Sequence, residues 1–466
     1  MKVMKFGGTS VGSAQRIKSV ATLVTKAGCP LVVLSAMSGT TNTLVEIAGY
    51  LYNRNADGAK DTIKRLESKY LKVVAELYAT QEAAAKAKQF VAETFALLDG
   101  ITRELFGPLQ EKVILAQGEL LSTHLMAYLL EEQGVNVALL PALDFMRTDL
   151  QGEPDPVYIR EHIAPLLAAT KADLYLTQGY ICRNAHGEVD NLHRGGSDYT
   201  ASLIGAAIDA EEIQIWTDID GMHNNDPRVV QGTKAVRHLH FDEAAELAYF
   251  GAKILHPTCI QPARYANIPV RLLNTMDPSA PGTLIDNTPE PGTIKAVAAK
   301  DNITAIKIKS SRMLLAHGFL RKVFEIFESY RTPIDMICTS EVGVSMSVDD
   351  TRYLSEIVHD LKKYGTVTVD LYMCIVCVVG DMDWENVGFE AKVLAAMEDI
   401  PVRMVGYGGS NYNISLLVKE EDKARTLQAL SRHLFETCKR EVFRWSASRS
   451  SAPRSTVMNG ACWNAP

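Results

Sequence analysis

The sequence predicts an α/β fold: a mainly parallel sheet sandwiched by helices, followed by two smaller ferredoxin-like units with the order βαββαβ. Two observations carry this prediction. Strand-like and helix-like segments alternate over the first part of the chain, which is typical of a parallel sheet with helical crossovers. Further along, strand and helix patterns occur twice in the same order, as in a ferredoxin-like repeat.

Strands of the first domain are expected at continuous apolar runs, because a strand covered by helices on both faces shows no alternation. The clearest run is LVVLSAM at residues 31–37, bounded by Pro30 and Ser38. Further strand candidates are VILAQ, VALLPAL, ADLYLTQGYI, IQIWTDI and IPVRLL. Apolar residues at three and four spacing predict helices over residues 60–106 and in GELLSTHLMAYLLEEQG and YTASLIGAAID.

A proline-rich segment, residues 274–293, predicts the end of the first domain, since its prolines do not suit a regular core element. We therefore place the first domain at residues 1–293 and the two ferredoxin-like units at 300–370 and 371–441. The remaining residues, 442–466, are polar, aperiodic and rich in Ser and Arg, and we expect them to be disordered.

Composition limits the classes of function. The 466 residues include 48 basic and 55 acidic side chains, so no basic excess points to nucleic acid. No apolar stretch approaches the roughly 20 residues of a membrane helix, and no signal-peptide pattern is present. Cys374 and Cys377 have C-x-x-C spacing but lie in an apolar run that predicts a buried strand. We expect a cytoplasmic protein that binds neither nucleic acid nor membrane.

A glycine-rich turn follows the first expected strand, in KFGGTSVGS. Lys5 ends the strand, and Gly7 and Gly8 let the backbone approach a ligand closely. A helix that begins after them would direct free amides and the positive end of its dipole at an anion. The segment is neither a dinucleotide fingerprint nor a Walker motif. A phosphate-binding loop and a tight turn with a surface lysine remain equal alternatives.

The segment HRGGSDYTAS repeats this arrangement. Arg194 offers a planar fork suited to a carboxylate, and Ser197 is a predicted helix N-cap. Asp198 either complements the helix dipole or orients a neighbouring lysine. Both turns would meet at the carboxyl ends of the strands, where sheets of this kind bind ligands.

Three other segments carry candidate polar side chains. Asp218, Asp226 and Arg228 lie in TDIDGMHNNDPRVV, for which a plain loop is the alternative. Lys253 follows a predicted helix and is otherwise a surface lysine at a helix end. Glu119 in GELLS is either a favourable acid in a first helical turn or the acceptor for an ammonium group.

Seven segments in this order resemble the aspartate kinases of the amino acid kinase family: KFGGTSV, SAMSGTTN, QGELLS, TQGYI, HRGGSDYTA, TDIDGMHNNDPR and FGAKILHP. GFLRKVFEIF and IDMICTSE resemble the first ACT domain of the lysine-sensitive members. The resemblance spans about residues 1–440 and implies that the two small units are ACT domains. It favours the monofunctional type, because no dinucleotide fingerprint follows for a homoserine dehydrogenase.

The resemblance implies transfer of the γ-phosphoryl of ATP to the β-carboxylate of L-aspartate, the first step towards lysine, methionine and threonine. An acid with a pKa of roughly 4 is ionised at neutral pH, so no general base is needed, and catalysis rests on positioning and charge. ATP brings Mg²⁺, whose ligands the sequence does not assign. The alternatives are another amino acid kinase, acting on glutamate or acetylglutamate, and a lysine-sensing protein without activity.

Roles at the active site follow from the resemblance by position. Lys5 would contact the transferring phosphoryl, Lys253 would hold the phosphates, and Asp198 would orient the lysines. The implied ATP-binding residues are Lys5, Gly7, Gly8, Thr217, Asp218, His223, Asp226, Arg228, Lys253 and Ile254. The implied aspartate-binding residues are Ser35, Thr41, Glu119, Tyr180, Arg194, Gly195, Gly196 and Ser197. In this set, Arg194 would clamp the α-carboxylate and Glu119 would take the α-ammonium. His223 and Tyr180 depart from the family, which often has Tyr and Phe there.

The resemblance also implies feedback inhibition by L-lysine, bound at ACT domains that pair across a homodimer or within a tetramer. The implied lysine-binding residues are Met313, Ala316, Gly318, Phe319, Leu320, Asp335, Thr339, Ser340 and Glu341. Asp335 would pair with the ε-ammonium, and otherwise it is an exposed strand acid. Ala316 departs from the serine of the lysine-inhibited relatives.

Overall fold

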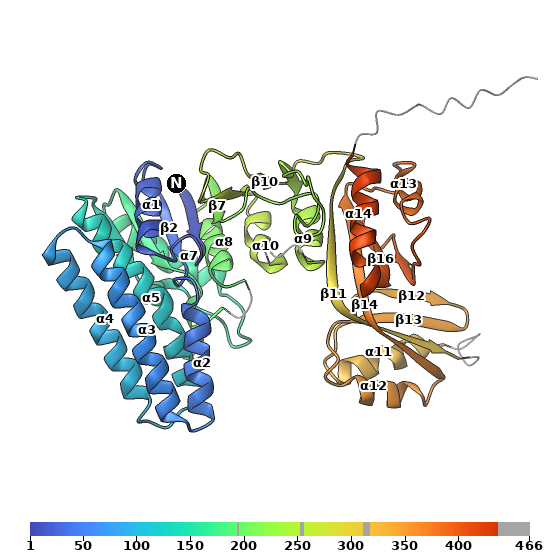
Figure 1. Cartoon of the computed structure of the whole chain (residues 1–466), viewed down its shortest axis with the longest axis horizontal. Coiled ribbons are helices and arrows are strands. Elements are labelled where there is room, and N and C mark those ends of the chain that lie inside the picture. Colours follow the sequence, from blue (N-terminus) through green and yellow to red (C-terminus); the bar gives the residue numbers. More distant parts are fainter. Residues whose placement is uncertain (193–194, 252–255, 311–316, 437–466) are drawn as a thin grey trace, which may run out of the picture.

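The computed structural model describes residues 1–192, 195–251, 256–310 and 317–436 (Figure 1). Two bodies are visible: a large domain with a bundle of long helices, and a smaller body built on the long strand β11 (Ile294–Lys309). Residues 442–466, for which the sequence predicts disorder, lie outside the described residues.

The large domain contains an eight-stranded sheet in the order β3-β4-β2-β1-β7-β9-β10-β8. All neighbouring pairs are parallel except β9 and β10. The strands are β1 (Lys2–Phe6), β2 (Leu31–Leu34), β3 (Val137–Leu140), β4 (Leu174–Gln178), β7 (Glu212–Thr217), β8 (His238–His240), β9 (Val270–Asn274) and β10 (Thr283–Asp286). A separate hairpin joins β5 (Ile181–Arg183) to β6 (Val189–Asn191). The mainly parallel sheet is therefore confirmed, with β1 inside it between β2 and β7.

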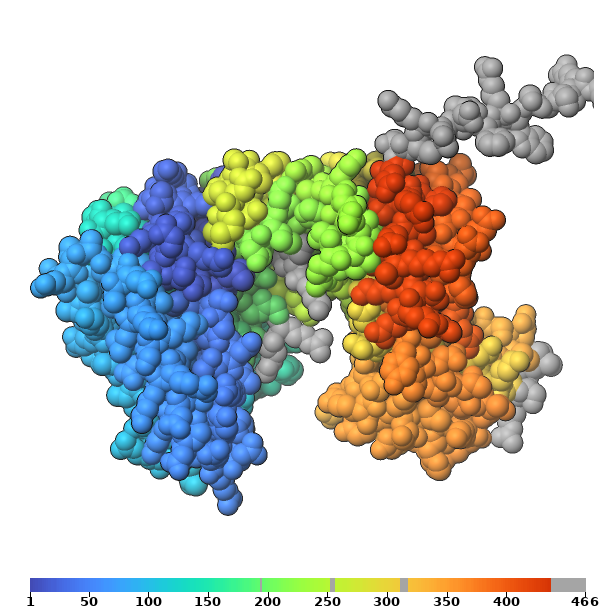
Figure 2. Space-filling view, viewed as in Figure 1, coloured from blue at the N-terminus to red at the C-terminus, as the bar shows by residue number. Residues whose placement is uncertain are grey.

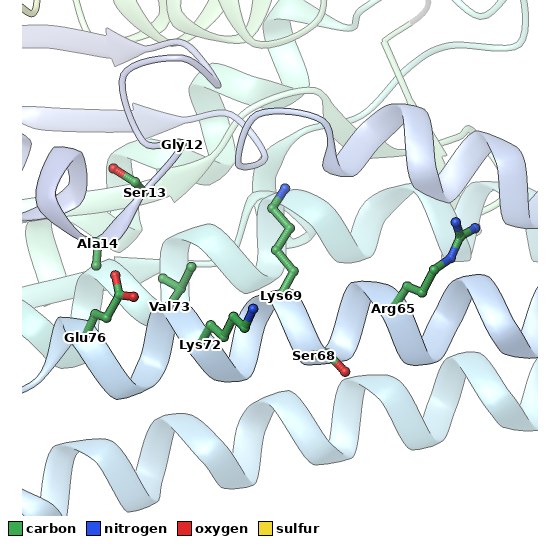
Figure 3. A pocket seen from close by; sticks show the side chains of 9 residues that line it. All are labelled: Gly12, Ser13, Ala14, Arg65, Ser68, Lys69, Lys72, Val73 and Glu76. Carbon is green, nitrogen blue, oxygen red and sulfur yellow. The ribbon is translucent and has the colours of Figure 1, made fainter.

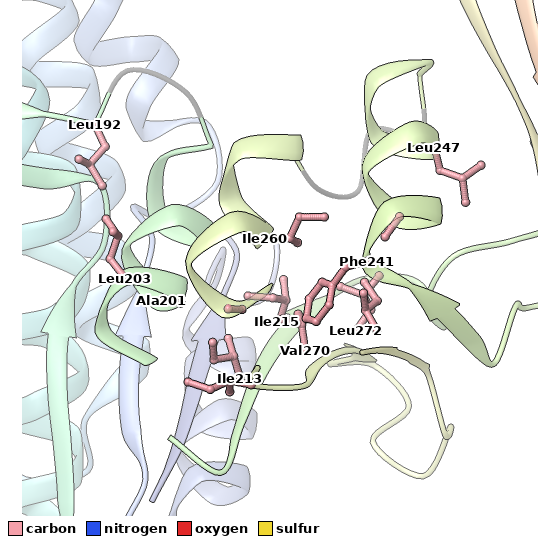
Figure 4. Close-up of a cluster of buried hydrophobic side chains, with 14 of the residues drawn as sticks. Leu192, Ala201, Leu203, Ile213, Ile215, Phe241, Leu247, Ile260, Val270 and Leu272 are labelled. Carbon is pink, nitrogen blue, oxygen red and sulfur yellow. The ribbon is translucent and has the colours of Figure 1, made fainter. Parts of the chain in front are cut away.

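Helices cover both faces of this sheet. One face packs on α1 (Ala14–Thr25), α2 (Thr40–Tyr52), α3 (Ala56–Leu77), α4 (Gln81–Ile101) and α5 (Pro108–Glu132). The other packs on α7 (Pro156–Ala169), α8 (Gly196–Ala207), α9 (Phe241–Tyr249) and α10 (Pro257–Tyr265), with the short α6 (Ala142–Phe145) beside them. Figure 4 shows part of this second core, where Ile215 and Leu272 of the sheet lie near Phe241. Burial on both faces explains the continuous apolar runs in the strands.

Two expectations for this domain were wrong. The run VILAQ lies inside α5 rather than in a strand. A short apolar run does not distinguish a strand from a buried helix, and α5 is apolar on most sides because it is enclosed. The expectation that the prolines of residues 274–293 exclude a regular core element was also wrong, because the segment contains β10, which pairs with β8 and β9. This strand lies within the expected domain, residues 1–293. Within the described part, α5 is the single helix long and apolar enough to cross a membrane, and 78% of its most apolar stretch is buried in the domain.

The smaller body is one six-stranded antiparallel sheet in the order β12-β13-β11-β14-β16-β15. Besides β11, its strands are β12 (Ile337–Ser340), β13 (Gly343–Val348), β14 (Thr366–Gly380), β15 (Met404–Gly406) and β16 (Asn413–Lys419). The helices α11 (Phe319–Ser329) and α12 (Leu354–Leu361) cover the first unit, whereas α13 (Phe389–Ala395) and α14 (Lys423–Leu434) cover the second, with the 3₁₀ turn η2 (Glu420–Asp422) before α14.

The two units share their central strands. Residues 303–309 of β11 pair with 366–373 of β14 in the first unit, and residues 294–300 pair with 375–380 in the second. Residues 294–300 of β11, an outer strand of the second unit, therefore precede the first unit in the chain. The limit expected between the two units, residues 370/371, falls inside β14. The repeat is not a simple tandem, because each long strand runs through both units, with a register shift between Lys300 and Ile303 at the junction.

The two bodies touch through α9 and the second unit, the green and red segments that meet in Figure 2. Asn413 donates a hydrogen bond to Glu246 Oε2 at 2.5 Å. The His240 and Tyr412 rings stack with centroids 5.4 Å apart.

Candidate active site

Lys5 and Asp198 form a buried ion pair. Lys5 follows Met4 on β1 with Val33 and Ile215 as its strand neighbours, so its side chain starts from the interior of the sheet. Its Nζ lies 2.6 Å from Asp198 Oδ1, which comes from the first turn of α8. Lys5 is only 8% exposed, so this carboxylate holds the ammonium in place. The expectation that Asp198 orients a lysine matches this geometry.

The turn after β1 differs from the expected anion loop. The helix α1 begins at Ala14 with Ser13 as its N-cap, well beyond the glycines. The N–H of Gly7 donates to Trp216 O at 3.3 Å. The amides of Gly7 and Gly8 therefore do not belong to the first turn of α1, and the Gly7 N–H is already bonded to Trp216 O. Gly8 serves close packing instead, since a Cβ there would lie 2.8 Å from Ala36 O.

The second glycine turn opens α8. Gly195, not Ser197, is the N-cap, with φ of 73°. A Cβ at Gly195 would lie 1.9 Å from Cys259 Sγ, so the position requires glycine both for its left-handed backbone and for space. Ser197 lies inside the first turn. Arg194 lies outside the described residues.

A cavity of about 330 Å³ lies between these two turns. Most of the residues expected to bind aspartate line it, which brings together parts of the chain that are far apart in sequence. The lining residues are Gly8, Ser35, Ala36, Met37, Ser38, Gly39, Thr41, Asn42, Glu119, Tyr180, Gly196 and Ser197.

Glu119 is the buried carboxylate of this cavity. It lies in the middle of α5 and is 4% exposed, so the alternative of a first-turn acid was wrong. The N–H of Ala36 donates to Glu119 Oε1 at 3.2 Å, whereas Oε2 has no hydrogen-bond partner among the described residues. Burial raises the pKa of Glu119 to about 8, against the opposing effect of the Ala36 N–H and Lys5. A ligand ammonium in the cavity would satisfy this carboxylate.

The segment expected to line the nucleotide follows β7. Thr217 Oγ1 lies 3.3 Å from Ile219 O, and His223 Nδ1 lies 3.0 Å from Thr233 Oγ1. Asp226 and Arg228 bind each other, with Arg228 Nη2 2.7 Å from Asp226 Oδ2.

The same segment reaches the second ACT-like unit. Asn225 Nδ2 donates to Leu427 O of α14 at 3.0 Å, and Val230 lies in the core of that unit. Asp226 and Arg228 do not line the 330 Å³ cavity in the described part of the chain. Lys253 and Ile254 lie outside the described residues.

One residue that holds the cavity wall was missed by the sequence analysis. Lys69 of α3 donates from Nζ to Ser38 O at 2.6 Å, and Ser38 and Gly39 line the cavity. No motif surrounds Lys69, and its partner is 31 residues away, so nothing in the local sequence marks it.

The expected effector residues lie in the first small unit. Gly318 is the N-cap of α11, Phe319 is buried in the unit's core, and Leu320 is partly exposed. Thr339 and Ser340 lie on the exposed strand β12, and Glu341 follows it. Met313 and Ala316 lie outside the described residues.

Asp335 is buried, not exposed, with a side chain only 2% accessible. Its Oδ1 accepts from Lys300 Nζ at 2.7 Å and from Tyr249 OH at 2.9 Å. Lys300 also lies 2.9 Å from Asp349 Oδ2. Burial raises the pKa of Asp335, and the Lys300 ammonium opposes that effect. An internal lysine thus already pairs with this carboxylate, and Tyr249 links it to α9 of the large domain.

Comparisons with known proteins agree with this architecture. Residues 1–274 match the profile of the amino acid kinase family, and residues 376–434 match an ACT domain. The lysine-sensitive aspartokinase 3 of Escherichia coli is 34% identical over 93% of this chain and 99% of its own length. The chloroplastic aspartokinase 3 of Arabidopsis thaliana is 34% identical over 93% of this chain and 82% of its own length.

Solved structures give the same result. Aspartokinase III of E. coli in complex with aspartate and ADP superposes with a TM-score of 0.77 at 32% identity, covering 93% of this chain and 100% of that one. The same enzyme in complex with lysine and aspartate gives a TM-score of 0.74 at 32% identity, covering 93% and 99%. The chain therefore belongs to the amino acid kinase family, and within that family to the aspartokinases.

Proposed function

We propose that this chain is an ATP-dependent aspartate kinase, which transfers the γ-phosphoryl of ATP to the β-carboxylate of L-aspartate and forms 4-phospho-L-aspartate and ADP. The observation that carries the proposal is the cavity between the two glycine turns. A buried, half-satisfied carboxylate, Glu119, lines this cavity together with Gly8 and Ser197. The Lys5–Asp198 pair lies close to these lining residues in the chain, with Lys5 Nζ near Gly7. A substrate with an ammonium at one end and a carboxylate at the other fits such a cavity.

The reaction needs charge placement more than proton transfer. The β-carboxylate is ionised at neutral pH and attacks phosphorus directly, with ADP leaving. Glu119 holds the α-ammonium, and Arg194 is expected to hold the α-carboxylate. Lys5, oriented by its ion pair with Asp198, offsets negative charge on the phosphoryl as it moves between two anions. Lys253 is expected to act from the donor side.

Magnesium enters this proposal with the nucleotide. In the described part of the chain, no group of three or more His, Cys, Asp or Glu side chains is arranged to hold a metal ion. Mg²⁺ commonly keeps several waters and binds through substrate phosphates with one or two carboxylates, so the chain does not need a preformed cage. Bound in this way, the ion supplies positive charge at the phosphates.

Lys5→Met tests the proposal, with Lys2→Met as a matched control on the same strand. The Lys2 side chain is 45% exposed, and its Nζ lies 3.9 Å from Glu212 Oε1. In a coupled ADP assay, we expect turnover with aspartate but not with glutamate or acetylglutamate. We expect Lys5→Met to lower kcat by at least about a hundredfold, since a buried charge that stabilises a transition state contributes about 3 kcal/mol or more, while Lys2→Met keeps it. Normal turnover in Lys5→Met, or a preference for glutamate, would contradict the assignment.

We also propose feedback inhibition by L-lysine at a homodimer formed through the ACT domains. Asp335 Oδ2 is buried and accepts no hydrogen bond from the described residues, so it has capacity for a second ammonium beside Lys300. Asp335→Ala is expected to raise the lysine concentration for half inhibition about tenfold, with kcat retained. Light scattering would report the dimer, and equal lysine sensitivity in both proteins would remove Asp335 from the site. The cytoplasmic location expected from the sequence stays a prediction.

A further inference from the structure

A second cavity lies on the far side of the Ser38 loop from the aspartate cavity. It has a volume of about 400 Å³ and lies between α3 and the start of α1 (Figure 3). Gly12, Ser13 and Ala14 form one wall, and the α3 side chains form the other, with Lys69 directed toward the loop before α2. This cavity is separate from the aspartate cavity of about 330 Å³, because the two share no lining residue.

The α3 wall is cationic. Arg65, Lys69 and Lys72 stand at positions i, i+4 and i+7, which lie on one face of a helix. Glu76 is the single acid that lines the cavity, at the next turn. Like charges at this spacing repel by a few tenths of a kcal/mol per pair, and a bound anion would relieve that repulsion.

Lys69 is the deepest of the three cations. It is partly buried, and its Nζ donates to the carbonyl of Ser38, with no carboxylate paired to it among the described residues. Burial lowers the pKa of Lys69, because no anion compensates the loss of water around the ammonium. Arg65 Nη2 lies 3.3 Å from Glu46 Oε1 and donates to Thr62 Oγ1 at 2.8 Å, and its side chain is largely exposed.

We infer that this cavity binds a small polyanion of the oligophosphate class, held by Arg65, Lys69 and Lys72. The three positions span seven residues of α3, about 10 Å along the helix axis, which suits several linked phosphates better than a single one. The ammonium of Lys69 has three donors, so it can bind the anion and keep the Ser38 carbonyl.

The site is coupled to the aspartate cavity through Lys69. A bound anion fixes the Lys69 side chain, which donates to Ser38 O, and so holds the loop that carries Ser35, Ser38 and Gly39 at the aspartate cavity. Anion binding should therefore tighten aspartate binding, and by reciprocity aspartate should tighten anion binding. This coupling rests on the proposed function, whereas anion binding itself does not.

The test is titration calorimetry of the full chain with tripolyphosphate, in the presence of ADP to occupy the nucleotide site. The variant Arg65→Gln/Lys72→Gln should bind tripolyphosphate at least tenfold more weakly than the wild type, since hydrogen bonds to charged groups are lost. The control Lys60→Gln/Lys64→Gln removes the same charge from the same helix at residues that do not line the cavity, and it should bind as the wild type does. Equal binding in both double variants would overturn the site.

Two further arms separate the alternatives. Inorganic phosphate should bind at least tenfold more weakly than tripolyphosphate, and equal affinity would refute the oligophosphate class. Aspartate affinity, measured with ADP, should rise at least threefold when tripolyphosphate is added to the wild type and stay unchanged in Arg65→Gln/Lys72→Gln. Anion binding without this rise would refute the coupling through Lys69, and a chain that binds the anion but not aspartate would refute the proposed function alone.

Discussion

Glu119→Gln is the perturbation that tests the buried carboxylate most directly. The substitution keeps the shape of the side chain and removes its charge. Glu119 is 4% exposed, and burial raises its pKa from 4.5 to about 8. The folded state therefore retains the proton up to about pH 8, whereas the unfolded chain loses it near pH 4.5.

The sign of the stability effect follows from this difference. Between pH 4.5 and 8 the folded state binds one more proton than the unfolded state, so the free energy of unfolding falls as pH rises. At about 1.36 kcal/mol per pH unit, the loss is at most about 5 kcal/mol. Glu119→Gln carries no such penalty, so we expect it to be several kcal/mol more stable than the wild type at pH 8.5 and close to it at pH 4.5.

The effect on the ligand has the opposite sign. Aspartate needs the ionised carboxylate, and at pH 7 the cost of removing its proton is about 1.4 kcal/mol. Wild-type affinity for aspartate should rise about tenfold from pH 6 to 7 and level off above pH 8, with about one proton released on binding. Glu119→Gln should bind about 10–100-fold more weakly, since a hydrogen bond to a charged group contributes about 1.5–3 kcal/mol, and its affinity should not depend on pH.

Calorimetry in two buffers of different ionisation enthalpy measures the released proton, and urea unfolding at pH 4.5 and 8.5 measures the stability. Glu131→Gln is the matched control, because Glu131 is an exposed carboxylate on the same helix. A wild-type affinity that is constant from pH 6 to 8 with no proton released, or a Glu119→Gln variant that gains no stability at high pH, would contradict a raised pKa at Glu119.

Two further predictions concern the packing of Gly195 and the ion pair between Lys300 and Asp335. Gly195→Ala places a Cβ against Cys259 Sγ at φ of 73° and should lower the free energy of unfolding by about 3 kcal/mol or more. The control Gly134→Ala has a similar φ and no neighbour within 4 Å, so it should lower the free energy of unfolding by only about 1 kcal/mol. Equal urea midpoints for the two variants would contradict this steric difference. Lys300→Met leaves Asp335 buried without its cation and should cost about 3 kcal/mol at pH 7. This loss of unfolding free energy should shrink at pH 4, as Asp335 takes up a proton. Lys362→Met, at an exposed lysine, is the control. A loss of unfolding free energy in Lys300→Met that does not change with pH would refute the pairing.

Local patterns in the sequence determined much of the fold. Largely apolar runs predicted β2, β4, β7 and β9, because a strand buried on both faces lacks the regular polar alternation of a half-exposed strand. The same rule failed for VILAQ, where a buried helix is equally apolar. The recurrence of strands and helices predicted two ferredoxin-like units, but not that β11 and β14 run through both, since strand pairing is decided between segments distant in the chain.

The candidate site likewise has features that the sequence predicted and features that only the tertiary structure revealed. The sequence by itself placed Lys5 near the end of a strand and a glycine turn at the start of α8, because these features depend on neighbouring residues; it placed the start of α1 too early. Only the tertiary structure brought Glu119 to Ala36, Lys69 to Ser38 and Lys300 to Asp335, across 83, 31 and 35 residues. Burial and charge pairing depend on what packs around a group in space, so the raised pKa of Glu119 and the Lys300–Asp335 ion pair had no local signature.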